Sequence, residues 1–142
     1  MADDEQVLPW YGNVVEWCDD WLRWTFRPQI DGRSRVWLAR WWEVDEAVCR
    51  LDALWQAWEA ARVQGGDAMS AWWLMHADPC LRLLMAPDGP LSRGIEGAEN
   101  RSRRGEPLPF AQPDYPEMFP LEDHLAPCHA GVTFDDEQDA DQ

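Results

Sequence analysis

The segment Trp37-Leu-Ala-Arg-Trp-Trp-Glu-Val-Asp-Glu-Ala-Val-Cys-Arg-Leu-Asp-Ala-Leu-Trp-Gln-Ala-Trp58 decides the fold, because its apolar residues recur every three or four positions. This is the spacing of one face of an α-helix. The apolar stripe comprises Trp37, Trp41, Val44, Val48, Leu51, Trp55 and Trp58. Periodicity alone allows one continuous helix over residues 35–63.

Two local signals favour a break near residues 43–45 over a continuous helix. The residues before the break are bulky and partly β-branched, which disfavours helix. Asp45, followed by Glu46 and Ala47, is typical of a helix start. The better-defined helix is therefore expected from about Asp45 to Val63, with Gly65-Gly66 ending it.

An earlier helix is marked by a capping pattern. Asn13 and Glu16 stand in the N-cap and N3 positions of a capping box, so the helix is expected to begin at Val14. Arg27-Pro28 ends it, because a residue before proline is pushed out of the helical region. Its inward face is expected to be Val14, Trp17, Trp21 and Trp24.

A third helical segment is expected from about Ser70, carrying Trp72, Trp73 and Met75. Asp78-Pro79 is expected to interrupt it and to start a short further helix. No alternating strand pattern is visible. The sequence therefore predicts an all-α fold: a small tryptophan-rich bundle of three to four helices, with a proline-rich, acidic, flexible C-terminal tail.

Composition predicts the domain organisation. The chain has 142 residues, the size of one domain, and all eleven tryptophans lie between Trp10 and Trp73. From residue 106 onward there are ten acidic residues, no arginine and closely spaced prolines. We expect an acidic N-terminal segment over 1–9, a helical domain over 10–90, a linker over 91–105, and a largely irregular or disordered tail over 106–142. Whether the tail docks on the domain is left open.

Charge and hydropathy limit the partners and the compartment. The net charge is -15, which opposes the counterion release that drives nucleic-acid binding, so no direct nucleic-acid contact is expected. The acidic N-terminus differs from a secretory signal, and no apolar run is long enough to span a bilayer. A cytoplasmic protein with no membrane association is expected. Its cysteines are expected to be reduced thiols acting as small buried hydrophobes.

Two His-x-x-x-Cys spacings raise the alternative of a metal site. His76 and Cys80 repeat the separation of His124 and Cys128, and two histidines with two cysteines suit tetrahedral zinc. However, a proline directly precedes each cysteine, the usual CxxC turn is missing, and the second pair belongs to the tail. We expect no metal and no cofactor.

No mechanistic motif predicts an enzyme. The chain lacks a nucleophile elbow, a phosphate-binding glycine loop and an HExxH sequence. His76 beside Asp78 is the one candidate acid or base, so a zinc-binding or hydrolytic enzyme centred near His76 stays an alternative. We expect a non-enzyme.

Several motifs in order resemble a known family. They are Tyr11-Gly-Asn-Val-Val-Glu-Trp17, Arg40-Trp-Trp-Glu-Val-Asp-Glu-Ala47, Arg50-Leu-Asp-Ala-Leu-Trp-Gln-Ala-Trp-Glu59 and Trp72-Trp-Leu-Met-His-Ala-Asp-Pro79. The chain is similar, over roughly residues 11–90, to an uncharacterised actinobacterial family known only as a domain of unknown function. Its members tend to be encoded on conjugative plasmids, integrative elements and phages. The resemblance implies an accessory protein of a mobile element, and it implies no reaction.

The function favoured from the sequence is a protein-interaction module. Eleven tryptophans exceed what an 80-residue domain buries, so some are expected to face a protein partner. The resemblance implies a partner from a DNA-transfer or phage apparatus. The candidate contact residues are Trp41, Trp42, Trp72, Trp73, Phe110 and Phe119. The alternative is an acidic DNA mimic of the anti-restriction type, because the same charge could imitate phosphates.

Overall fold

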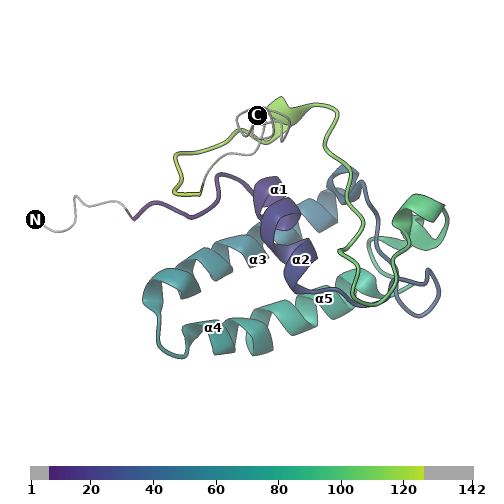
Figure 1. Ribbon diagram of the computed structural model, residues 1–142, viewed down its shortest axis with the longest axis horizontal. Coiled ribbons are helices and arrows are strands. Elements are labelled where there is room, and N and C mark those ends of the chain that lie inside the picture. The colour runs from purple at the N-terminus through teal and green to yellow at the C-terminus, as the bar shows by residue number, and fades with distance from the viewer. Residues whose placement is uncertain (1–6, 127–142) are drawn as a thin grey trace, which may run out of the picture.

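The computed structural model describes residues 7–126 and confirms the all-α expectation for them. Three helical rods form the body (Figure 1). The first rod comprises α1 (Val14–Trp17), the π-helical η2 (Cys18–Leu22) and α2 (Arg23–Thr25). The second is α3 (Asp45–Gln64), and the third comprises α4 (Ala68–Ala71), the π-helical η4 (Trp72–Ala77) and α5 (Asp78–Met85).

Short turns and extended chain complete the described residues. The 3-10 turns are η3 (Trp41–Glu43), η5 (Ser92–Ile95), η6 (Ala98–Asn100) and η7 (Pro116–Met118). The second and third rods lie side by side, joined by a short turn, and the first rod crosses them (Figure 1). From residue 91 the chain returns across this body toward the N-terminal segment. No helix within residues 7–126 combines the length and apolar character that a bilayer crossing needs.

The first helix begins where its cap predicts. The Glu16 amide donates to Asn13 Oδ1 (2.8 Å), and the Gly12 amide donates to Glu16 Oε1 (3.0 Å). The Glu16 amide, which the helix leaves without an acceptor, is thereby satisfied, and so is the Gly12 amide just before the cap. Phe26 is already extended, so the rod ends just before the arginine and proline that were expected to stop it.

The break between helices also lies where the sequence places it. η3 ends at Glu43, Val44 is extended, and α3 begins at Asp45. The helix ends at Gln64, and Gly65 follows with a φ of 73°, a left-handed conformation that glycine adopts at little cost. The continuous helix over residues 35–63 is therefore wrong, because the bulky residues before Val44 form extended chain and a 3-10 turn.

Helix geometry explains why Pro79 does not interrupt the third rod. η4 continues into α5 without a break, so the expected interruption is wrong. Proline lacks an N–H and is tolerated where a helical hydrogen-bond register begins. The π-helical η4 has the i→i+5 register and ends at Ala77, so Pro79 falls in the first turn of the α-helical register of α5.

Tryptophan rings in contact with one another form the centre of the core. Trp17, Trp37, Trp41 and Trp72 are almost completely buried. The ring centroids of Trp17 and Trp72 lie 6.2 Å apart at 86°, and those of Trp21 and Trp58 lie 5.1 Å apart. Since these rings come from the first, second and third rods, aromatic contacts hold the three rods together.

Residues 91–105 are not a linker, and the chain after them packs on the body. Leu91 and Leu108 are completely buried in the same core as the tryptophans. The buried Asn100 side chain accepts from the Ala39 amide (2.8 Å). A Cβ on Gly94 would lie 1.9 Å from the Trp37 carbonyl oxygen, so only glycine permits this approach. The expected domain boundary at residue 90 therefore differs from the structure.

Extended chain from the expected tail supplies acceptors to buried indoles. Trp37 Nε1 donates to the Pro109 carbonyl (3.0 Å), and Trp42 Nε1 donates to the Ala111 carbonyl (2.8 Å). Further along, the Ala126 amide donates to the Trp10 carbonyl (2.8 Å). The tail is irregular, as expected, but residues 106–126 are attached to the domain. Residues 127–142 lie outside the described residues.

A buried carboxylate anchors the N-terminal segment to α3. Glu59 Oε1 accepts from the Trp10 amide (2.8 Å) and from Arg62 Nε (3.2 Å). Glu59 Oε2 accepts from the Tyr11 amide (3.0 Å) and from Trp55 Nε1 (2.9 Å). Both oxygens are fully used, so Glu59 is a structural group rather than a free acid.

Truncation tests whether the extended chain belongs to the domain. A chain ending at Gly105 loses the buried Leu108 and the acceptors of two indoles, which costs about 4 kcal/mol of unfolding free energy. Urea unfolding followed by circular dichroism should show a much lower midpoint. A chain ending at Ala126 keeps these contacts and serves as the control. Equal midpoints for the two truncated chains would contradict the revised boundary.

Substitution of Glu59 tests the anchor. In Glu59→Gln the amide NH₂ replaces an oxygen that accepts two N–H groups, so two donors lose their acceptor and the unfolding free energy falls by about 2–3 kcal/mol. The matched control is Glu46→Gln, which loses only an exposed ion pair with Arg50 and should cost at most about 0.5 kcal/mol. Thermal unfolding measures both, and the anchor is refuted if the two variants melt together.

Candidate functional site

The tryptophans proposed as partner contacts are mostly inside the protein. Trp41, Trp42 and Trp72 are buried and Trp73 is half-buried, so the expectation that they face a partner is wrong for the first three. Residues 91–126 enlarge the core beyond the expected 80-residue domain, which accommodates the excess of indoles. The Arg40 guanidinium covers Trp42 at 4.6 Å from the ring centroid.

The two tail phenylalanines contact the protein's own domain. Phe110 and Phe119 are half-buried against the core cluster. The Arg23 guanidinium lies 5.8 Å from the Phe110 ring centroid. Asn13 Nδ2 donates to the Phe119 carbonyl (2.6 Å). Both rings are therefore engaged within the chain.

The structure separates the proposed zinc ligands. His76 is exposed beside the half-buried Cys80, whereas His124 Nε2 lies 3.3 Å from Glu16 Oε1 at the start of α1. Among the residues that the structure describes, no group of three or more His, Cys, Asp or Glu side chains could hold a metal ion. Cys128 lies outside the described residues.

Exposed apolar side chains gather instead on the outer face of the third rod. Leu74 and Met75 are each 70% exposed, and Leu83 is also exposed. Met75, Pro79 and Leu83 are spaced i, i+4 and i+8 and line one face. They border a hollow of about 340 Å³, which Arg50 and Ala53 of α3 close on the other side. A second hollow of about 700 Å³ shares Pro79 and Leu83. We call this surface the α3/α5 groove.

The π-helical turn is the reason that sequence reading missed this groove. At α-helical spacing Met75 falls on the face of Trp72, three residues earlier. η4 has a wider turn, which moves Met75 out of register with Trp72. Trp72 is consequently buried and Met75 is exposed.

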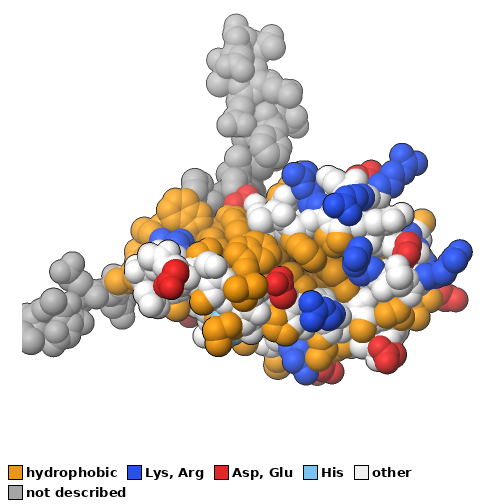
Figure 2. All heavy atoms as spheres, turned by 90° about the horizontal axis from the view of Figure 1, so that it is seen from below, with side chains coloured by type: hydrophobic (Ala, Val, Ile, Leu, Met, Phe, Trp, Pro, Cys, Tyr) orange, Lys and Arg blue, Asp and Glu red, His pale blue; other side chains and the backbone are white. Residues whose placement is uncertain are grey.

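A second surface carries arginines from two loops far apart in sequence. The Ile30 amide donates to the Ser102 carbonyl (2.9 Å), and the Gly105 amide donates to the Arg27 carbonyl (3.0 Å), so the two loops run side by side. Figure 2 shows arginines gathered on one half of the face seen there. We call the exposed arginines of these loops the arginine surface: Arg27, Arg33, Arg35, Arg103 and Arg104. The sequence signalled only the short cluster at residues 101–104.

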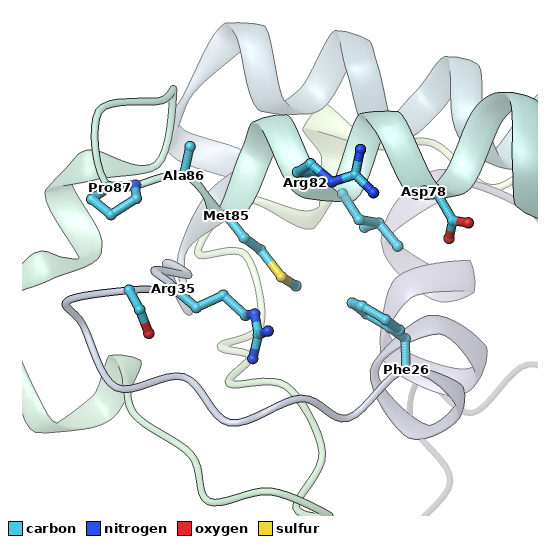
Figure 3. Close-up of a pocket in the computed structure, with 9 residues that line it drawn as sticks. Phe26, Arg35, Asp78, Arg82, Met85, Ala86 and Pro87 are labelled. Carbon is cyan, nitrogen blue, oxygen red and sulfur yellow. The ribbon is translucent and has the colours of Figure 1, made fainter.

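A hollow adjoins the arginine surface. Its volume is about 420 Å³, and its lining includes Phe26, Leu81 and Met85 (Figure 3). Arg35 and Arg82 bring guanidinium groups to it, and Asp78 brings a carboxylate. An apolar floor with charged groups of both signs suits a flat ring that carries polar substituents.

Comparison with known proteins assigns the family. A family model described as "Domain of unknown function (DUF4913)" matches residues 11–114. The chain belongs to this family. The match extends past residue 90 and so includes the segment that supplies the indole acceptors. No curated protein and no solved structure matches the chain.

The DUF4913 match carries no catalytic assignment. His76 and Asp78 are both exposed, and the hollow beside His76 is bordered mainly by apolar side chains. The alternative of an acidic DNA mimic needs carboxylates arrayed on a rigid surface, and the dense carboxylate run over residues 135–141 lies outside the described residues.

Three thiols of the DUF4913 domain occupy different environments. Cys18 is buried, Cys80 is half-buried and Cys49 is exposed, so the expectation of burial is wrong for Cys49. Burial raises the pKa of the Cys18 thiol and of the Cys80 thiol, which lowers the thiolate fraction at neutral pH.

Alkylation distinguishes these thiols. With iodoacetamide at pH 8, we expect Cys49 to react first, Cys80 more slowly and Cys18 only after unfolding, because thiolate and access are both required. Peptide mass spectrometry over a time course gives the three rates, and the denatured chain provides the control. Equal rates for Cys18 and Cys49 in the folded protein would contradict the burial of Cys18.

Proposed function

We propose that this DUF4913 protein is a non-catalytic protein-interaction module that binds its partner through the α3/α5 groove. The observation that supports this proposal is the exposure of Met75 (70%) and Leu83 (39%), which both line the hollow that faces α3. The protein buries most of its largest apolar side chains, including seven of the eleven tryptophans. Large apolar side chains that stay this exposed on a helix are therefore unusual. A contiguous apolar patch with a polar rim is typical of an interface.

The free energy gained by burying the apolar side chains of the groove is large enough to anchor a partner. Fully burying a leucine or methionine side chain contributes about 1.5–3 kcal/mol, and the groove offers Met75 and Leu83. Ordering the flexible methionine side chain offsets part of that free energy, so the affinity depends on the fit of the partner. Methionine adapts to different partner shapes.

The form of the groove favours a helical partner segment. The stripe of Met75, Pro79 and Leu83 faces α3 across the hollows, which leaves room for an amphipathic helix to lay its apolar side between them. Arg50 and Glu46 form an ion pair with each other (2.9 Å) and contribute to the polar rim of the groove. The proposal includes a cytoplasmic accessory role for a mobile element, with the partner sought among its DNA-transfer or phage proteins.

Paired surface variants test this function. Met75→Ser and Leu83→Ser remove apolar area from the groove without touching the core, so they should weaken partner capture at least about tenfold while the melting temperature stays unchanged. Val63→Ser is the matched control, since Val63 is exposed near the end of α3 and lines neither hollow.

Binding of each purified candidate partner, measured by calorimetry, gives the readout. Capture that Met75→Ser, Leu83→Ser and Val63→Ser all leave intact would refute the groove as the contact surface. Turnover in an activity screen that His76→Ala abolishes would favour the enzyme alternative instead.

A further inference from the structure

We propose that the arginine surface, together with the hollow beside Arg35, binds single-stranded nucleic acid. This inference goes beyond the proposed function, because it concerns a different surface and a different class of partner. It also replaces the expectation, drawn from the net charge of -15, that no nucleic acid is contacted. The net charge describes the whole chain, whereas charges interact mainly within a Debye length of about 8–10 Å.

The first argument for this proposal is the distribution of ion pairs. Arginines elsewhere in the described chain are paired with carboxylates: Arg23, Arg40, Arg50, Arg62 and Arg93. Arg101 donates to the carbonyls of Gly94 and Ile95 and so fixes the second loop. None of the five arginines of the arginine surface has a carboxylate partner among the described residues, and the same holds for Arg82 beside the hollow. All the unpaired guanidinium groups of residues 7–126 therefore gather in one region.

The carboxylates of the two loops in this region, Asp31 and Glu106, already accept hydrogen bonds from within their own loops. Asp31 Oδ1 accepts from the amides of Arg33 (2.9 Å), Ser34 (2.9 Å) and Arg35 (3.1 Å), and Asp31 Oδ2 accepts from the Ser34 hydroxyl. These bonds shape the loop that presents Arg33 and Arg35. Glu106 accepts from the Arg103 amide and shapes the other loop in the same way. Arg35 Nη1 donates to the Gln29 carbonyl (3.3 Å), but no carboxylate among the described residues pairs with these guanidinium groups, so they stay available to an external anion.

The hollow specifies which polyanion fits. The Phe26 ring, with Leu81 and Met85, offers an apolar surface on which a nucleobase can rest (Figure 3). Arg35 and Arg82 at its walls can pair with the flanking phosphates, and the Asp78 carboxylate can accept from an N–H of the base, such as N3–H of thymine or uracil. A base in a duplex is stacked and paired, so it cannot enter the hollow without being extruded.

Two other classes of ligand would contact only part of this region. A mononucleotide would fill the hollow but leave Arg27, Arg103 and Arg104 unused. An acidic polypeptide would satisfy the guanidinium groups, but it has no regular use for a ring-sized hollow beside them. A strand of linked phosphates and bases uses the arginine surface and the hollow at once.

Fluorescence anisotropy of a labelled oligo(dT), with an oligo(rU) arm, tests the proposal on the full chain. If about four phosphates are contacted, the logarithm of the association constant should fall with the logarithm of salt concentration with a slope of about -3. Arg104→Gln should make that slope less steep by about 0.7, the share of one phosphate contact. Phe26→Leu should lower affinity about tenfold and leave the slope unchanged, because it removes a stacking surface and no charge.

Arg50→Gln is the matched control, since it makes the same change in net charge at an ion-paired site. Circular dichroism of each variant serves to check that it is folded. The proposal is overturned if oligonucleotides fail to bind at low salt, if Arg50→Gln weakens binding as much as Arg104→Gln, or if thymidine monophosphate competes as well as the oligonucleotide. Binding of polyglutamate in place of the oligonucleotides would identify an acidic protein partner instead and would equally overturn it.

Discussion

A buried indole loses its water and needs an acceptor for its single N–H, and this requirement shapes much of the molecule. Trp37, Trp42, Trp55 and Trp72 find one, whereas the Nε1 atoms of Trp17 and Trp58 are buried with no acceptor among residues 7–126. Trp72 donates to the Leu54 carbonyl across two rods (3.0 Å), whereas Trp37 and Trp42 donate to carbonyls of the proline-rich segment. Helical carbonyls are mostly used within their own helix, so an extended chain is the better source of free acceptors. The prolines that look like a disordered tail in the sequence keep this chain extended. Trp37 and Trp42 therefore depend on the proline-rich segment for their hydrogen-bond acceptors.

The helical body also explains where the two candidate surfaces lie. α5 contributes Pro79 and Leu83 to the α3/α5 groove, and Leu81, Arg82 and Met85 to the hollow beside the arginine surface. One short helix thus places apolar side chains on one side and a charged wall on the other. The loops of the arginine surface depend on the same body, because Val36 donates its amide to the Met85 carbonyl (2.8 Å).

The sequence predicts local structure well and long-range packing poorly. The Asn13 cap, the break before Asp45 and the glycine stop after Gln64 are all written in a few neighbouring residues. The attachment of residues 91–126 is not, because Leu108 and Pro109 meet Trp37 only after the chain has folded back. The exposure of Met75 was not predicted for a different reason: periodicity assumes α-helical turns, and η4 is π-helical. The arginine surface joins loops separated by about seventy residues, so no window along the chain contains it.

The close packing of indoles has an optical consequence. Trp17, Trp21, Trp58, Trp72 and Trp73 form an unbroken network of rings whose neighbouring centroids lie between 4.8 and 6.2 Å apart. At such separations the electronic transitions of neighbouring rings couple, and excitation migrates among them before emission. The protein consequently carries an internal chromophore array whose near-ultraviolet dichroism and emission report on the docking of all three rods, with no added label.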